Sequence, residues 1–333
     1  MTLMRDRSLL PVPAFVDLPR DAASLHVERA AAAVEAARVV RAAHPPAPTT
    51  DDRPRIAAFG IDVQVGFAIP GASLFVPGAP DDTARTVRWL YAHAARLTRL
   101  YFSLDTHAVF QIFHPSWWRD AAGNPPAPLT VISPDDVRAG RWIPRFSPDE
   151  SRAYVEALAE RGKYVLTIWP FHTLLGGTSH ALVPAVMEAA LFHATLRDEA
   201  PVFVTKGTHP LTESYSAMSP EVTEVAGRAV GGFDAALFDA LFAHDHVYVY
   251  GQAKSHCVLS TLEDLVAHAE RVDPALVRRL AVLVDATSPV PAPPLDPLPP
   301  ELDFPRVADA AFERLAKRGV RLVRTTDPLP THP

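Results

Sequence analysis

Hydrophobic positions follow two alternating periods along the chain from residue 56 onward. Short apolar runs rich in β-branched and aromatic residues predict buried strands, whereas apolar residues that recur every three or four positions predict amphipathic helices. The expected strands span residues 56–61, 100–104, 164–168, 202–205, 247–250, 280–284 and 320–323. Helices are expected between most of them, at residues 82–98, 148–161, 182–196, 233–243, 255–270 and 307–318.

This alternation predicts the fold class. Strands separated by helices require crossover connections, which place helices on both faces of a parallel sheet. We therefore expect an α/β protein with three α/β/α layers around a central, mostly parallel sheet. The domain is expected to span residues 55–327, after an N-terminal helical extension of residues 1–54 whose helix covers residues 22–43.

Two further segments are expected to be insertions or surface loops. Residues 121–146 form a long stretch without clear periodicity, and residues 289–300 are rich in proline. Proline-rich stretches favour an extended polyproline conformation, so we expect the second segment to act as a semi-rigid connection.

Composition narrows the class of protein. The chain has 333 residues, 48% hydrophobic and 21% charged, which is typical of a soluble globular protein with a substantial core. The net charge of −6 argues against nucleic acid or an anionic membrane as a partner. With one cysteine, no intrachain disulfide can form. No signal peptide and no apolar run of roughly 20 residues is evident, so we expect a cytoplasmic protein.

Titratable side chains gather just after the predicted strands. In open parallel sheets, ligands bind beyond the carboxyl ends of the strands. Residues of this kind follow five separate strand ends: Asp62, Asp105 with His107, His172, Lys206 and Cys257. Core packing or a solvated surface does not account for five such positions along one edge, so the sequence predicts a functional site there.

The single cysteine is a candidate nucleophile. Cys257 follows a strand and a short turn at the start of a predicted helix, where free backbone N–H groups favour the thiolate. The alternative is a buried structural cysteine. A cysteine nucleophile needs a base and a group that stabilises negative charge. Asp62 could accept the thiol proton, and Lys206 could favour the ionised forms, although each residue could instead serve only a chain turn.

A metal site is the second hypothesis. Asp105 and His107 alternate on an extended segment, so their side chains point to the same side. A carboxylate and an imidazole suit Zn²⁺, Mn²⁺ or Fe²⁺. A third ligand could come from His172 or from His114, and the spacing leaves both open.

Six segments match, in order, the motifs of a known family. They are residues 59–67 (FGIDVQVGF), 70–79 (PGASLFVPGA), 103–107 (SLDTH), 169–178 (WPFHTLLGGT), 206–207 (KG) with 215–217 (YSA), and 251–258 (GQAKSHCV). On these motifs the chain resembles the isochorismatase-like cysteine hydrolases, and within them it is most similar to the nicotinamidases. The resemblance covers residues 56–326 and implies the isochorismatase-like hydrolase fold.

The resemblance also implies an activity, which is hydrolysis of nicotinamide to nicotinate and ammonia through a thioester. It assigns catalysis to Asp62, Lys206 and Cys257, and an oxyanion hole to the backbone N–H groups of Ala253 and Cys257, after a cis Gln252–Ala253 peptide bond.

The remaining implied residues bind the substrate ring and a metal. Phe67 and Trp169 would pack against the ring, and one divalent cation would bind to Asp105, His107 and His172. Zinc is the first expectation for this cation, with manganese or iron as alternatives. The expected partner is a small-molecule amide, and a homo-oligomer is left open.

The chain also departs from the family pattern. Val65 and Gly66 replace the usual Asn and Asp, Thr173 replaces a Cys, and Lys254 and His256 are unusual before the nucleophile. Three alternatives therefore stand beside nicotinamide hydrolysis. They are a related amidohydrolase for another small amide or carbamoyl compound, a non-catalytic binding protein, and a metal-only hydrolase in which Cys257 is structural.

Overall fold

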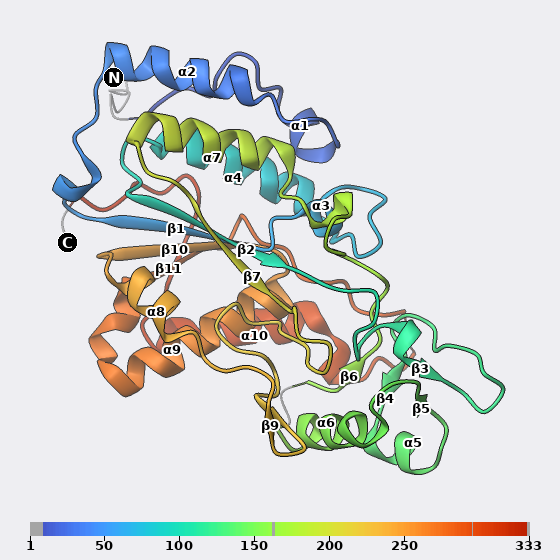
Figure 1. Cartoon of the computed structure of the whole chain (residues 1–333). Helices are drawn as coiled ribbons and strands as arrows, with labels where there is room; N and C mark the ends of the chain where they lie inside the picture. Colours follow the sequence, from blue (N-terminus) through green and yellow to red (C-terminus); the bar gives the residue numbers. More distant parts are fainter. Residues whose placement is uncertain (1–8, 162–163, 295, 332–333) are drawn as a thin grey trace.

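The centre of the molecule is a six-stranded parallel sheet (Figure 1). The computed structural model describes residues 9–161, 164–294 and 296–331, so residues 1–8 of the expected extension and residue 295 of the proline-rich segment lie outside it. The strand order is β12-β11-β10-β1-β2-β7, and each neighbouring pair is parallel. The strands are β1 (Ile56–Ile61), β2 (Arg99–Asp105), β7 (Val202–Lys206), β10 (His246–Gly251), β11 (Leu280–Leu283) and β12 (Arg321–Val323).

Helices cover both faces of this sheet, which confirms the predicted three-layer α/β fold (Figure 1). One face carries α4 (Ala79–His93) and α7 (Pro184–Arg197), with α2 (Ala30–Ala43) outside them, and the other carries α8 (Ala235–Phe242), α9 (Leu259–Val272) and α10 (Phe304–Lys317). Among the described residues, no helix is both long enough and apolar enough to cross a membrane.

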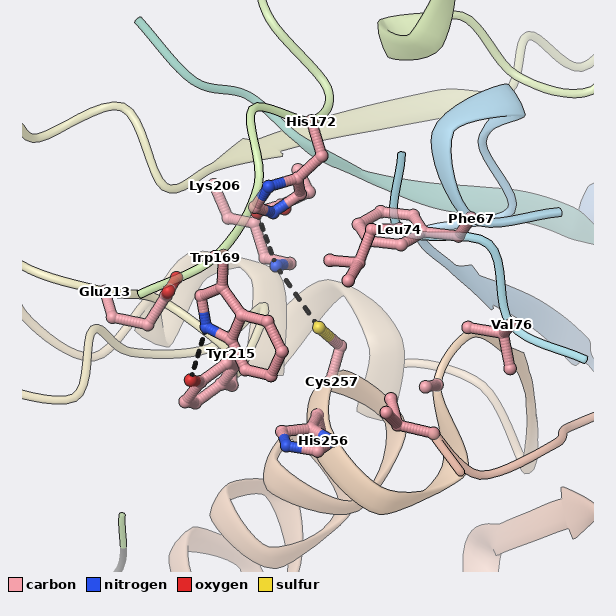
Figure 2. A pocket seen from close by; sticks show the side chains of 13 residues that line it. Phe67, Leu74, Val76, Trp169, His172, Lys206, Glu213, Tyr215, His256 and Cys257 are labelled. Carbon is pink, nitrogen blue, oxygen red and sulfur yellow. Dashed lines mark hydrogen bonds and ion pairs between the residues drawn. The ribbon is translucent and has the colours of Figure 1, made fainter. Parts of the chain in front are cut away.

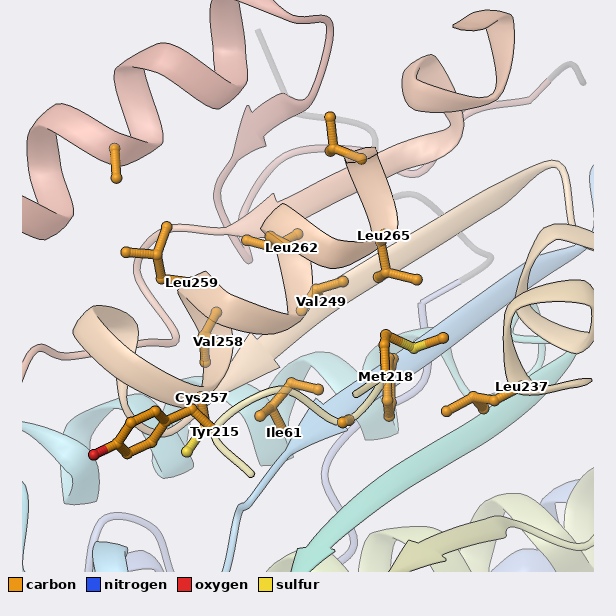
Figure 3. Packing of buried hydrophobic residues seen from close by; sticks show 14 of the residues in the cluster. Ile61, Tyr215, Met218, Leu237, Val249, Cys257, Val258, Leu259, Leu262 and Leu265 are labelled. Atoms are coloured by element: carbon orange, nitrogen blue, oxygen red, sulfur yellow. The ribbon is translucent and has the colours of Figure 1, made fainter. Parts of the chain in front are cut away.

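The central strands are buried on both faces, so their side chains divide between two cores. In β1, all six residues are buried, as the near-continuous apolar run of a covered parallel strand requires. Successive side chains point to opposite faces. Phe59 therefore joins the core under α9 and α10, whereas its neighbour Ala58 joins the core under α4 and α7. Figure 3 shows the first of these cores, with Cys257 and Tyr215 at its margin.

The predicted strand at residues 164–168 is wrong as a member of the central sheet. Only β6 (Leu166–Thr167) is a strand, and it pairs antiparallel with β4 (Val131–Ile132) from the segment expected to be a loop. This pairing leaves Val165 half exposed, so the apolar run is not that of a strand buried on both faces.

The segment around residues 121–146 is therefore more ordered than an insertion loop. It contains α5 (Pro134–Arg138) and β5 (Ile143–Pro144), which pairs with β3 (Trp118–Arg119), and α6 (Pro148–Arg161) follows it. Ser133 caps α5, because its side chain accepts a hydrogen bond from the Asp136 N–H group. The Asp136 carboxylate accepts a hydrogen bond from the Ser133 N–H group in turn, which completes a capping box. A further two-stranded pair joins β8 (Glu224–Val225) to β9 (Arg228–Ala229).

The N-terminal helix is also interrupted. Instead of one helix over residues 22–43, the chain forms α1 (Arg20–Ala23) and α2, with Arg29 between them. The Arg29 backbone N–H donates to Glu188 Oε1 at 2.8 Å, and its guanidinium donates to both Glu188 and Asp21. Because buried Glu188 on α7 binds the Arg29 N–H, that donor is satisfied outside a helix. The division at residue 54 stays a prediction.

Candidate active site

The ends of four neighbouring strands bring the predicted residues together at one edge of the sheet. Asp62 follows β1, Asp105 ends β2, Lys206 ends β7, and Cys257 lies in the turn that follows β10. These strands are adjacent in the order β10-β1-β2-β7, so their carboxyl ends meet at this edge.

His172 reaches the same edge by another route. It follows β6, which lies outside the central sheet, and its loop pairs with the segment after β2. The His107 N–H donates to the Thr173 carbonyl at 3.2 Å, and the Leu175 N–H donates to the His107 carbonyl at 2.9 Å. This short parallel bridge places His172 beside His107, with ring centroids 4.7 Å apart.

Lys206 is the charged centre of the site (Figure 2). Its buried Nζ lies 2.8 Å from Asp105 Oδ1 and 3.0 Å from Asp62 Oδ2. It also donates to the Ser214 carbonyl at 2.8 Å. An ammonium has three N–H donors. Here they are directed to Asp105 Oδ1, the Ser214 carbonyl and Cys257 Sγ, whereas Asp62 Oδ2 is an ion-pair partner without a hydrogen bond. In this position Nζ lies 3.7 Å from Cys257 Sγ.

Glu213 supports the contact between Lys206 Nζ and the Ser214 carbonyl. Glu213 was not identified from the sequence as a site residue. Its Oε1 accepts the Ser214 N–H at 2.9 Å, which fixes the peptide whose carbonyl receives Lys206. Burial, together with the negative charge of Asp105, raises the pKa of Glu213 to about 8. An isolated acidic residue in a loop carries no sequence signal for such a role.

Cys257 occupies a π-helical turn (Lys254–Val258) immediately before α9. Its side chain is 8% exposed. Burial raises the pKa of the thiol well above its usual range, the Lys206 ammonium opposes this, and the Asp62 and Asp105 carboxylates add to it. Burial and two nearby carboxylates therefore act against the thiolate form, which the helix start was expected to favour.

Asp62 is suited to accept the thiol proton. Its backbone has a positive φ of 47°, in the left-handed region, and its carboxylate is fully buried. Ser103 Oγ donates to Asp62 Oδ1 at 2.6 Å and accepts the Asp62 N–H at 3.0 Å, so one hydroxyl fixes both groups. Burial raises the pKa of Asp62, with Lys206 acting against it. A carboxylate with a raised pKa is a stronger base.

Asp105, His107 and His172 form a group that could hold a metal ion, with ligand atoms within 4.8 Å of one another. The Nδ1 atoms of His107 and His172 lie 3.1 Å from the Gly207 carbonyl and 2.7 Å from the Pro170 carbonyl. A carbonyl only accepts, so Nδ1 carries a proton in each ring.

The opposite nitrogen of each ring turns toward Asp105. The Nε2 atoms of His107 and His172 lie 2.7 Å and 3.4 Å from Asp105 Oδ2. His107 Nε2 is buried but makes no hydrogen bond, which is the arrangement of two ligands that face a shared cation. Two imidazoles, each hydrogen-bonded to a backbone carbonyl, together with one carboxylate are a usual set of ligands for Zn²⁺ and similar divalent metals. Gly207 leaves room for the His107 ring, because a Cβ at position 207 would lie 2.7 Å from His107 Cε1.

The structure brings His172, rather than His114, into this group. The His114 ring lies 5.7 Å from the His107 ring, and burial and the neighbouring imidazoles lower its pKa to about 3. Asp105 stays ionised, because His107 and Lys206 outweigh the effect of burial and hold its pKa well below the usual range.

A pocket joins the metal group to the cysteine, with about 420 Å³ of empty space including its opening. In Figure 2, Phe67, Leu74 and Val76 lie on one side of Cys257, and Trp169 and Tyr215 lie on the other. Trp169 Nε1 donates to Tyr215 Oη at 2.9 Å, which fixes the aromatic side. The pocket thus contains both residues predicted to bind the substrate ring. Six lining residues had been assigned no role from the sequence: Leu74, Val76, Glu213, Tyr215, His256 and Val290.

Ala253 also lines the pocket, and the Gln252–Ala253 peptide bond is cis as expected. In the described part of the chain, the Ala253 N–H has no backbone or side-chain acceptor. It is therefore free to bind an oxygen of a ligand beside Cys257.

No protein-family profile and no curated protein sequence matches the chain. Solved structures do match. A nicotinamidase/pyrazinamidase from Acinetobacter baumanii is 19% identical, with a TM-score of 0.51 over 83% of this chain and 99% of that chain. The yeast nicotinamidase Pnc1p, bound to the inhibitor nicotinaldehyde, is also 19% identical, with a TM-score of 0.51 over 81% of this chain and 99% of that chain. The chain has the fold of these two nicotinamidases. This fold contains the whole central sheet and the edge at which Asp62, Lys206 and Cys257 meet.

Proposed function

We propose that the protein is a metal-assisted cysteine amidohydrolase that converts nicotinamide to nicotinate and ammonia. The observation that carries this proposal is that Cys257 and Lys206 line one small pocket together with Asp105 and His172 of the metal group, while Asp62 lies 3.0 Å from Lys206 Nζ. A binding protein gains nothing from a buried carboxylate–ammonium–thiol arrangement. The fold of the present chain, which it shares with two nicotinamidases, agrees with the proposal.

Asp62 begins the reaction by taking the proton from Cys257 Sγ as the sulfur attacks the carboxamide carbon. Because the thiol pKa is raised, proton transfer and attack belong together, and Lys206 stabilises the negative charge on sulfur. The resulting oxyanion accepts hydrogen bonds from the N–H groups of Ala253 and Cys257. The carbon–nitrogen bond then breaks, and Asp62 returns the proton to the leaving amine, which departs as ammonia.

A thioester on Cys257 remains. Water attacks its carbonyl carbon while Asp62 accepts a proton from that water. The carbon–sulfur bond then breaks, Asp62 returns the proton to Cys257 Sγ, and nicotinate leaves after its carboxyl proton passes to solvent. Ser103 keeps the Asp62 carboxylate at one orientation in both halves of the reaction, through the hydrogen bond of 2.6 Å to Oδ1.

The shape of the pocket supports a planar aromatic amide. Phe67 and Trp169 lie on opposite sides of Cys257, so a flat ring between them would be held while its carboxamide reaches the sulfur (Figure 2). A divalent cation on Asp105, His107 and His172 would supply a Lewis acid for the ring nitrogen. Yeast Pnc1p binds nicotinaldehyde, a pyridine with an electrophilic carbonyl, which agrees with a pyridine amide as the substrate.

The test is ammonia release from nicotinamide, pyrazinamide and several aliphatic amides, with metal content measured on the same sample. We expect turnover of the pyridine and pyrazine amides only, with about one metal per chain. Cys257→Ala should abolish turnover and keep the fold. Ammonia release by that variant would rule out the covalent mechanism. Turnover of aliphatic amides alone, without metal, would assign the site to a different amidohydrolase.

A further inference from the structure

The proline-rich segment contributes a wall of the pocket, although its sequence predicted only a surface connection. Val290 lines the pocket beside Ala253 and Cys257. It packs with Val76 and Ala253 against the core under α4 and α7, whereas Trp169 and Tyr215 belong to the opposite core. Val290 therefore lies on the apolar side of the pocket, facing the aromatic side.

The backbone around Val290 is stiff. Pro289 and Pro291 flank it, and a proline fixes its own φ and restricts the residue before it. We refer to residues 288–291 as the strap. Since both neighbours of Val290 are prolines, its backbone has little freedom to move away from a ligand.

The strap is tied to the turn that carries the cysteine. The Lys254 N–H donates to the Ser288 carbonyl at 2.9 Å, and the Val290 N–H donates to Ser255 Oγ at 3.1 Å. At its other side, Ser288 packs against Gly78, where an added Cβ would lie only 2.5 Å from Ser288 Oγ. The strap is thus held between the start of α4 and the π-helical turn, so its position follows that of Cys257.

We propose that Val290 is a specificity-determining residue that limits the width of the pocket and restricts it to flat, unbranched ring amides. This inference rests on the proposed function for its substrate class. The physical basis is steric, because a wall held by two prolines and two hydrogen bonds does not yield to an added methyl group. Discrimination of one methyl or methylene group in a rigid apolar pocket reaches about 10-fold to about 200-fold.

The first experiment compares nicotinamide with ring-methylated nicotinamides in wild type, Val290→Ala, Val290→Phe and the control Leu298→Ala. Leu298 belongs to the same proline-rich segment but does not line the pocket. We expect Val290→Ala to raise kcat/KM for the methylated amide relative to nicotinamide by about 10-fold, and Val290→Phe to lower kcat/KM for both. Leu298→Ala should keep the wild-type ratio. A ratio unchanged in both Val290 variants would overturn the proposal.

A second readout separates this inference from the substrate assignment. Cys257 is alkylated with iodoacetamide and with the bulkier N-phenyl iodoacetamide, and the rates are measured by mass spectrometry of the intact chain. We expect Val290→Ala to raise the ratio of the alkylation rate with the bulky reagent to that with the small reagent by about 10-fold. Leu298→Ala should leave this ratio of rates unchanged. If wild type fails to hydrolyse nicotinamide, the proposed function fails, yet this ratio still decides the role of Val290. Equal ratios in wild type and Val290→Ala would refute it.

Discussion

Replacing Lys206 with methionine tests the electrostatic basis of the site most directly. The substitution keeps most of the length of the side chain but removes the ammonium that lies 3.7 Å from Cys257 Sγ. At that distance and an effective dielectric constant of about 20, the attraction between an ammonium and a thiolate is about 4.5 kcal/mol. Its loss lowers the thiolate population at a given pH by roughly three orders of magnitude.

Two effects return part of this loss. Without its counter-ion, buried Asp62 binds a proton more readily, which removes a negative charge near the sulfur. A less acidic thiol also forms a more nucleophilic thiolate. We therefore expect Lys206→Met to slow alkylation of Cys257 by iodoacetamide by about 100-fold at neutral pH, and to abolish amide hydrolysis.

Lys254→Met is the matched control, because Lys254 lies in the same turn as Cys257 but points elsewhere. Its Nζ is paired with Asp309 and lies 4.9 Å from the centre of the Phe312 ring. The control should be alkylated at about the wild-type rate. Circular dichroism and thermal melting establish that both variants fold. A folded Lys206→Met protein alkylated as fast as wild type would refute the electrostatic role of Lys206.

Three further predictions concern the metal group, the loop beside Lys206 and the core. Wild type should bind about one zinc per chain, and His172→Ala should lose it while His114→Ala keeps it, measured by mass spectrometry of metals after dialysis; loss in His114→Ala alone would contradict the ligand set. Glu213→Leu should lower kcat about 10-fold, because the buried Ser214 N–H loses its acceptor, whereas Glu213→Gln keeps one and should stay near wild type; equal losses in both variants would show that the charge of Glu213 matters instead. Burial lowers the pKa of His193 to about 4, although its Nε2 lies 2.9 Å from the Leu97 carbonyl. Because the folded pKa lies below the unfolded value of about 6.5, the contribution of His193 to stability is complete above pH 6.5 and is lost as the pH falls toward 4, by up to about 1.4 kcal/mol per pH unit. Urea unfolding of wild type and His193→Gln across this range should show a shallower pH dependence in the variant, and parallel curves would contradict the assignment.

The apolar pattern predicted the fold where a segment is buried on both faces. Residues 56–61 and 247–250 read as continuous apolar runs, and they became β1 and β10 at the centre of the sheet. The pattern failed at residues 164–168, where an equally apolar run pairs with β4 outside the sheet. A short apolar run indicates that a segment is buried, but it does not indicate which other segment packs against it.

The roles of side chains that act through other residues could not be predicted from the sequence either. Glu213 reaches Lys206 only through the Ser214 peptide, and Ser103 matters because β2 lies beside β1. Neither relation leaves a spacing that a linear pattern can reveal. The pKa of Cys257 illustrates the same limit, because it is raised by burial and by carboxylates that lie far from Cys257 in the sequence.

By itself, the sequence determined the order of the six central strands and of the main helices between them, and the placement of Asp62, Asp105, Lys206 and Cys257 at or after strand ends. Those residues meet because strands of a parallel sheet end at one edge, which is a rule that sequence order already contains. Only the tertiary structure decided that His172 arrives through a bridge to His107, that two carboxylates and a carbonyl contact the Lys206 ammonium, and that a proline-flanked valine lines the pocket. These features depend on contacts between segments far apart in the chain, where loop packing rather than local preference sets the geometry.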